Sequence, residues 1–176
     1  MISKIATLFF SIALIFGSYS TVQAQDYIGS AKCGMCHKSA TKGNQLGKWK
    51  EGPHAKALKS LSSPESLAYA KENGIADPTK DAKCLKCHST YHSASEDLML
   101  TIKDTEGVSC ESCHGPGSKY KSAAVMKSQA KSLANGLILP TKEVCVTCHN
   151  EDNPFHKPFD FDAYVKKIAH PNPASK

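Results

Sequence analysis

Four copies of one short pattern, Cys-x-x-Cys-His, contain every cysteine of this 176-residue chain. The copies occupy residues 33–37, 84–88, 110–114 and 145–149. A histidine follows each pair at once, and the irregular intervals between the copies exclude a tandem repeat of fixed period. The chain must therefore fold around whatever chemistry these motifs share.

The histidine after each pair distinguishes among the chemistries that are open to paired cysteines. Disulfides suit a small exported chain, but they require no histidine. Zinc can bind two Cys-x-x-Cys pairs, yet it gives no reason for a histidine at the next position every time. Thioredoxin-like dithiols need a βαβ context that this sequence lacks.

Covalent haem attachment explains every position of the motif. The two thiols add to the two vinyl groups of the porphyrin, and the adjacent histidine binds the iron as its proximal ligand. We therefore predict four covalently bound c-type haems, numbered 1 to 4 in chain order. The predicted thioether anchors are Cys33, Cys36, Cys84, Cys87, Cys110, Cys113, Cys145 and Cys148. The predicted proximal ligands are His37, His88, His114 and His149.

The first 24 residues have the three parts of a secretory signal peptide. Lys4 is basic, residues 5–17 are apolar, and small residues precede Gln25. The apolar run is shorter than the roughly 20 residues that span a bilayer, so we expect no stable membrane anchor. We predict cleavage after residue 24, a single domain over 25–176 and a periplasmic location, with an extracellular location as the alternative.

Side chains alone offer little material for an apolar core. Trp49 is the only tryptophan, and aromatic residues make up 7% of the chain. We predict a mainly α fold with extensive loops and little or no β-sheet, a small multihaem cytochrome c fold packed around four haems. Helices are expected over 63–74, 118–136 and 159–170, and the single strand candidate, a short hairpin arm, is 98–104.

The sixth ligand of each iron determines what the haem does. Two histidines close the iron, a methionine raises its potential, and an empty position can bind a small molecule. Methionine is a weaker candidate for the sixth ligand than histidine. Met35 lies inside a motif, which leaves Met99 and Met126. We expect two-histidine ligation for at least three haems. The four histidines outside the motifs are the distal candidates: His54, His92, His156 and His170.

Four stretches of the chain resemble, in order, the tetrahaem cytochrome c-554 family. They are KCGMCHK, WKEGPHAKALKSL, GVSCESCHGPGSKY and FDFDAYVKKIAH, and the resemblance that they mark extends over nearly the whole mature chain. The third also resembles larger multihaem enzymes. The resemblance implies an electron carrier in which His54 ligates haem 3, opposite His114, and His170 ligates haem 1, opposite His37.

The chain departs from the family pattern at two places. The family takes the distal histidine of haem 4 from the segment after the third motif, but residues 118–140 contain no histidine. The family also leaves haem 2 without a sixth ligand, whereas His156 here follows the fourth motif. We assign His156 to haem 2 and His92 to haem 4, with the reverse assignment as an alternative. His92 is also a candidate for an ordinary exposed loop residue.

The formal charge of +6 overstates the charge of the loaded protein. Each ferric two-histidine haem, with its propionates, adds about −1, so nucleic-acid binding is not indicated. We predict an electron-transfer protein between redox partners, with no chemistry of its own. Reduction of a small nitrogen species such as nitric oxide at an open haem is the alternative. A third hypothesis is an extracellular filament, so the chain is expected to be a monomer or a haem-linked oligomer.

Overall fold

The computed structural model describes residues 25–173 and is built from short helices. The signal peptide expected over residues 1–24 lies outside the described residues. The described chain contains no named strand, in agreement with the predicted mainly α fold, and none of its helices is long and apolar enough to cross a membrane. The eleven α-helices within 25–173 are α1 (Ser30–His37), α2 (Gln45–Glu51), α3 (Ala57–Ser60), α4 (Pro64–Glu72), α5 (Ala82–His88), α6 (Thr90–Ser93), α7 (Cys110–His114), α8 (Ala123–Met126), α9 (Gln129–Ala134), α10 (Lys142–Val146) and α11 (Phe161–Ile168). Three 3₁₀ helices join them: η1 (Ala40–Lys42), η2 (His54–Lys56) and η3 (Glu96–Leu98).

Two of the predicted helices are confirmed together with their end signals. The Ser63 side chain caps α4 by accepting from the Ser66 N–H at 3.2 Å, and Gly74 follows the helix with φ +69°. The Asp160 carboxylate caps α11 by accepting from the Ala163 N–H at 3.0 Å. The last helix ends before Pro171, as its sequence indicates.

The two other expected elements differ from the structure. Residues 118–136 form two short helices, α8 and α9, rather than one, because the Ser128 hydroxyl caps a new helix by accepting from the Lys131 N–H. The hairpin arm predicted at 98–104 is wrong. Met99 instead makes an isolated parallel bridge with Tyr27, which lies far away in the sequence.

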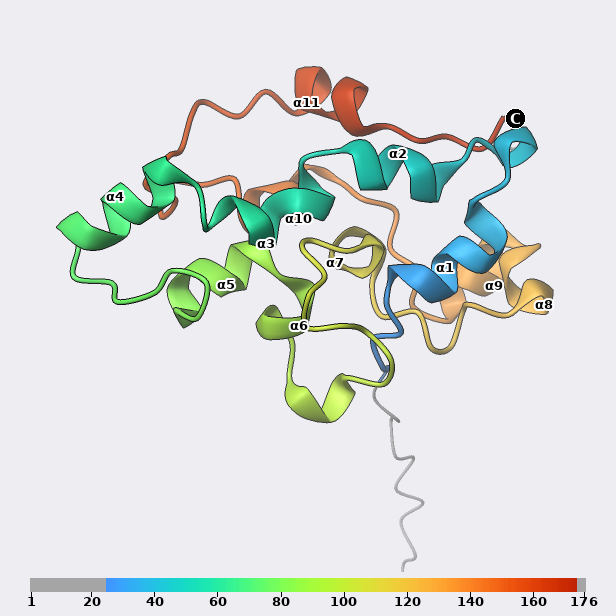
Figure 1. Ribbon diagram of the computed structural model, residues 1–176. Helices are drawn as coiled ribbons and strands as arrows, with labels where there is room; N and C mark the ends of the chain where they lie inside the picture. Colours follow the sequence, from blue (N-terminus) through green and yellow to red (C-terminus); the bar gives the residue numbers. More distant parts are fainter. Residues whose placement is uncertain (1–24, 174–176) are drawn as a thin grey trace, which may run out of the picture.

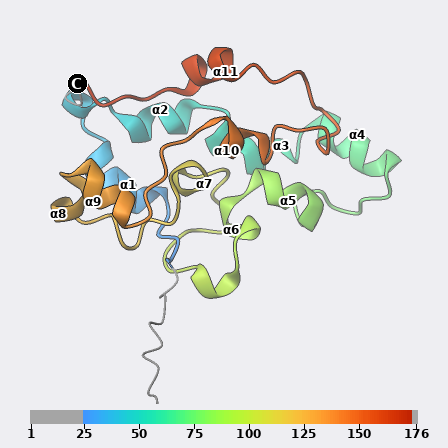
Figure 2. The same ribbon diagram turned by 180° about the vertical axis from the view of Figure 1, so that it is seen from behind.

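The helices form an elongated array rather than layers. Both views show α1, α8 and α9 at one end, α4 and α5 at the other, and α7 and α10 between them (Figures 1 and 2). The segment with α11 runs back along α2 to η1, where Gly43, with φ +98°, lies against the Pro171 carbonyl. The C-terminal part of the chain thus returns to the end that holds α1.

Apolar burial within residues 25–173 is sparse and scattered. The buried hydrophobic side chains come from distant parts of the chain and share no single centre: Ile28, Leu61, Ala70, Leu85, Ile102 and Tyr120. Six polar or charged side chains are buried as well, among them Glu111 at 2% exposure. A protein of this size normally needs a larger core, a metal or a cofactor to fold, which agrees with a fold packed around haem.

Candidate haem-binding sites

The first three motifs each occupy the last residues of a helix. Helices α1, α5 and α7 all end at the motif histidine, His37, His88 or His114. In an α-helix, positions i, i+3 and i+4 lie on one face. The two cysteines and the histidine of each motif therefore point to the same side, as attachment of one haem requires.

The fourth motif has the same local geometry without a full helix. Helix α10 ends at Val146, but the His149 N–H donates to the Cys145 carbonyl at 3.0 Å, which continues the helical turn through the motif. The Cys148 N–H donates to the same carbonyl at 3.2 Å. All four predicted sites thus present two thiols and an imidazole on one face.

The thiols do not form the alternative sites that paired cysteines can make. All eight cysteines lie within the described residues, and all eight are free of disulfides. Between residues 25 and 173, no group of three or more histidine, cysteine, aspartate or glutamate side chains could hold a metal ion.

Two proximal histidines are oriented through their Nδ1 atoms. His88 Nδ1 lies 2.7 Å from the Ala57 carbonyl oxygen, and His114 Nδ1 lies 3.1 Å from that of Ile138. An Nδ1–H that donates to a carbonyl leaves Nε2 unprotonated and able to bind a metal. Burial also lowers the pKa of His114, which favours the neutral, ligating form. These contacts fit the role of iron ligands.

His114 and His170 face each other with a spacing that suits an iron between them. Their ring centroids lie 6.0 Å apart at an interplanar angle of 77°. Two imidazoles, each bound at about 2 Å from a shared metal ion, have centroids roughly 6 Å apart. His170 Nδ1 lies 2.9 Å from the Ile168 carbonyl oxygen, so both rings of the pair have Nε2 available.

His54 and His149 form a second pair of the same dimensions. Their ring centroids are 6.1 Å apart at 66°. Burial, and then the proximity of His149, lowers the pKa of His54. Phe159 stacks on His149 at 5.0 Å and 16°. This pair joins η2 to the fourth motif.

These ring pairs differ from the pairs that the family resemblance implied. His54 is paired with His149 instead of His114, and His170 is paired with His114 instead of His37. The Val108 N–H, just before α7, donates to the His54 carbonyl at 3.0 Å, while the His54 ring lies near His149. Among the ring contacts of residues 25–173, none joins His37 or His88 to a second histidine.

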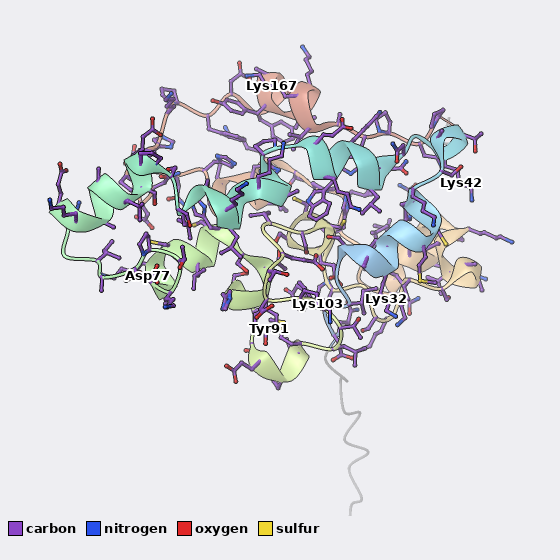
Figure 3. The ribbon with its side chains drawn as sticks, in the orientation of Figure 1. Lys32, Lys42, Asp77, Tyr91, Lys103 and Lys167 are labelled. Atoms are coloured by element: carbon purple, nitrogen blue, oxygen red, sulfur yellow. The ribbon has the colours of Figure 1, made fainter. Side chains whose placement is uncertain are left out.

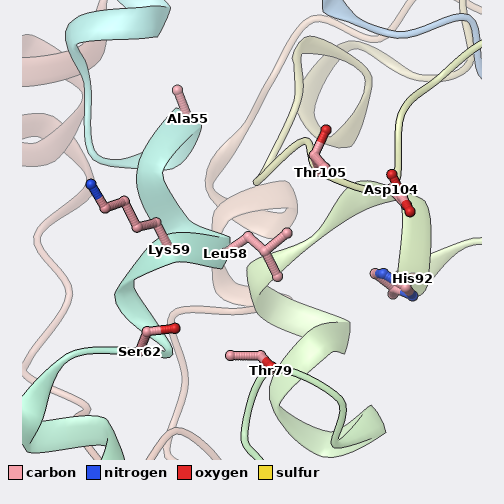
Figure 4. Close-up of a pocket in the computed structure, with 8 residues that line it drawn as sticks. All are labelled: Ala55, Leu58, Lys59, Ser62, Thr79, His92, Asp104 and Thr105. Atoms are coloured by element: carbon pink, nitrogen blue, oxygen red, sulfur yellow. The ribbon is translucent and has the colours of Figure 1, made fainter.

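The two remaining histidines line different cavities. His156 shares a cavity of about 200 Å³ with His149, Phe159 and Tyr164, and its proximity adds to the burial that lowers the pKa of His149. His92 lines an open cavity of about 400 Å³ between α3 and α6, with Leu58 and Asp104 (Figure 4). His92 is itself exposed. His156 thus lies beside the fourth motif, whose histidine is already paired with His54.

The motif cysteines also meet across the fold. The Cys33 thiol donates to Cys110, which raises the pKa of Cys33 and lowers that of Cys110. Burial and then Cys145 raise the pKa of Cys113 to about 11. Burial and then Cys148 raise the pKa of Cys87 to about 11. The motifs are therefore neighbours in the spatial order first, third, fourth and second.

Sequence reasoning missed several residues that position these sites. The Glu111 carboxylate, inside the third motif, accepts from the N–H groups of Ile28, Gly29 and Gly117 at 2.7 to 3.1 Å. The Tyr120 hydroxyl donates to the Gly115 carbonyl at 2.6 Å. A glutamate between two cysteines carries no distinctive pattern, so only the fold could identify its role.

Comparisons with known proteins identify similar c-type cytochromes. The family model described as "Cytochrome c554 and c-prime" matches residues 32–115, which contain the first three motifs. Cytochrome c-554 of Nitrosomonas europaea is 35% identical over 143 residues, covering 69% of this chain and 56% of the relative. The chain thus spans little more than half the length of that relative. No solved structure matches the chain.

Proposed function

Because the chain belongs to the cytochrome c-554 family, we propose that it is a periplasmic carrier with four covalent haems that transfers electrons between redox partner proteins. Family membership supports a c-type cytochrome electron carrier with covalently bound haem. The count of four includes the fourth motif, at 145–149, which lies beyond the family match. The periplasmic location is supported by the signal-like residues 1–24.

The spatial order of the motifs is the observation that carries this proposal. Each bound haem supplies a one-electron redox centre. Both views show the motif-bearing elements in the order α1, α7, α10 and α5 along the molecule (Figures 1 and 2). The chain therefore arranges its attachment sites in one continuous series from α1 to α5, and such a series is what a relay between two partners requires.

The ring pairs support a specific ligand set for two of the haems. We assign His170 as the distal ligand opposite His114, and His54 as the distal ligand opposite His149. Both pairs have the spacing of two imidazoles on one iron, and His114 and His170 each use Nδ1 in a hydrogen bond. Both assignments bring distant parts of the chain together through a metal.

A second candidate function is supported at the second motif. His156 was the histidine expected to close the haem on His88, but it lies beside His149 instead. Among the ring contacts of residues 25–173, none joins His88 to a second histidine, whereas His114 and His149 each have one. These features favour an open sixth position at this motif, where a small nitrogen species could be reduced.

The electron paramagnetic resonance spectrum of the oxidised holoprotein tests both candidates. Two-histidine irons are low-spin, whereas an iron without a sixth ligand is high-spin. A high-spin component of about one haem in four would support the open site, and a wholly low-spin spectrum would rule it out.

Single variants test the ligand pairs. We expect His170→Ala and His54→Ala each to convert about one further haem to the high-spin form. His92→Ala is the matched control, because His92 is exposed and makes no ring contact with a motif histidine among the described residues. An unchanged spectrum in His170→Ala would refute the pair with His114.

A further inference from the structure

Two segments of the chain contain many lysines and no acidic residue. Neither segment 30–50 nor segment 118–140 contains an aspartate or a glutamate. All of their lysine side chains are exposed. The nine lysines are Lys32, Lys38, Lys42, Lys48 and Lys50 in the first segment and Lys119, Lys121, Lys127 and Lys131 in the second.

The fold brings these two segments to the same end of the molecule. Helices α1, α8 and α9 lie together there in both views (Figures 1 and 2). The Gln25 side chain, just before α1, donates to the Asn135 carbonyl at 2.9 Å, just after α9. Figure 3 shows Lys32 and Lys42 at this end and Asp77 at the other. We call the surface formed by the nine lysines the basic end.

The opposite end has a mixed charge. Segment 63–97 contains four lysines but six acidic residues. Its lysines also find acidic neighbours, because Lys80 pairs with Asp77 at 3.2 Å and Lys86 pairs with Asp152 at 4.0 Å. The molecule is therefore electrically polar along the series of motifs, with the first motif at the basic end and the second motif at the mixed end.

An exposed apolar side chain lies within the basic end. Met35, inside the first motif, is 69% exposed. Lys32 and Lys38 flank Met35 in the sequence. Protein interfaces commonly combine an apolar centre, often with methionine, and a charged rim that orients the partner.

We propose that the basic end is the docking surface for an electron-transfer protein that presents carboxylates around its own redox centre. The proposal rests on the proposed electron-carrier function and adds which end exchanges electrons with that partner. A ferric haem with two propionates contributes only about −1, which is small beside the formal charge of nine lysines. An acidic partner would be steered to this end, where the first motif lies.

The test compares charge reversal at the two ends of the holoprotein. Reduced flavodoxin, an acidic protein, is the probe, and stopped-flow absorbance measures the rate of haem reduction. The variant is Lys32→Glu/Lys38→Glu. The control is Lys71→Glu/Lys83→Glu at the mixed end, where both lysines are also exposed. Haem absorbance and far-UV circular dichroism establish that each variant is loaded and folded.

At low ionic strength we expect the variant at the basic end to slow reduction about tenfold and the control to change it less than about twofold. The difference should vanish near 0.5 M salt, where the screening length is only about 4 Å. If substitution next to the motif impairs haem loading, Lys42→Glu/Lys48→Glu makes the same comparison farther from it. Equal rates in both variants would overturn the proposal and leave the lysines as an ordinary solvated face.

A second reductant separates failure of this proposal from failure of the proposed function. Hexaammineruthenium(II) is a small cation, so lysine charge should not attract it. If the wild-type protein accepts electrons from neither reductant, the carrier function itself is refuted. If charge reversal abolishes binding to phosphatidylglycerol vesicles but leaves the flavodoxin rate unchanged, the surface binds membranes and the proposal is wrong.

Discussion

The third and fourth motifs have the same sequence pattern but very different surroundings. Around the third, Glu111 accepts hydrogen bonds from residues more than 80 positions earlier in the chain, and the Ser109 N–H donates to Thr90 Oγ1 at 2.7 Å. Around the fourth, the hydrogen bonds that the structure describes join residues at most four positions apart. Hydrogen bonds between protein groups thus hold the third site in place. At the fourth site the long-range contacts are those of the His54 and Phe159 rings with His149.

The difference shows what each site needs from the haem. A buried carboxylate that satisfies three backbone N–H groups fixes the chain around the third motif by itself. Helix α10 has no side-chain cap and no buried residue. We therefore expect the third site to be rigid, and the fourth to gain most of its order from haem attachment and iron ligation.

Glu111→Ala, at the third motif, should lower the free energy of unfolding more than the other changes considered below. The change leaves three N–H groups in a buried region without an acceptor, so we expect the free energy of unfolding to fall by about 3 to 5 kcal/mol. Urea denaturation of the holoprotein, followed by far-UV circular dichroism, measures it. Glu143→Ala in α10 is the matched control and should leave the midpoint unchanged. Equal urea midpoints for the two variants would show that Glu111 does not stabilise the third site.

Amide hydrogen exchange in the holoprotein should show the same contrast without mutation. The amides of Ile28, Gly29 and Gly117 donate to the buried carboxylate, whereas those of Cys148 and His156 donate to local carbonyls near the surface. We expect the first group to exchange about 100-fold more slowly. Similar protection of both groups would contradict the difference in rigidity.

Tyr120→Phe should have an intermediate effect. It removes a hydroxyl that donates to the Gly115 carbonyl, and burial raises the pKa of Tyr120 so that this donor stays protonated. We expect a loss of about 1 kcal/mol in the free energy of unfolding. Tyr164→Phe, beside the fourth motif, should cost less than about 0.5 kcal/mol. A larger loss of unfolding free energy in Tyr164→Phe than in Tyr120→Phe would contradict the expectation that the third site is the more rigid.

The smallest expected effect is an increase in the free energy of unfolding. Thr141 precedes α10 without making a side-chain cap, and asparagine is a stronger N-cap. Thr141→Asn should therefore raise the free energy of unfolding by about 0.5 kcal/mol, measured by the same denaturation. A loss of stability would mean that the fourth motif is already shaped by contacts that its hydrogen bonds do not reveal.

Local features of this chain could be predicted from its sequence, because local physics determines them. The Ser63 and Asp160 caps and the helical faces of the motifs follow from residues a few positions apart. The split between α8 and α9 was missed because Ser128 competes with a continuous helix, and a periodic apolar pattern does not reveal that competition.

The pairing of distant histidines could not be predicted in the same way. The residues next to His54 and His170 in the sequence do not indicate which motif histidine each one faces. Their partners depend on where η2 and the C-terminal segment cross the other helices. The role of Glu111 was equally hidden, because its three donors come from two other parts of the chain.

The C-terminal segment contacts two motifs at once. Phe159 and Tyr164 lie against His149, and His170 faces His114. One short segment, residues 159–170, therefore completes the surroundings of the third and fourth motifs together. Loss of this segment would leave every attachment motif present and two of the sites incomplete at the same time.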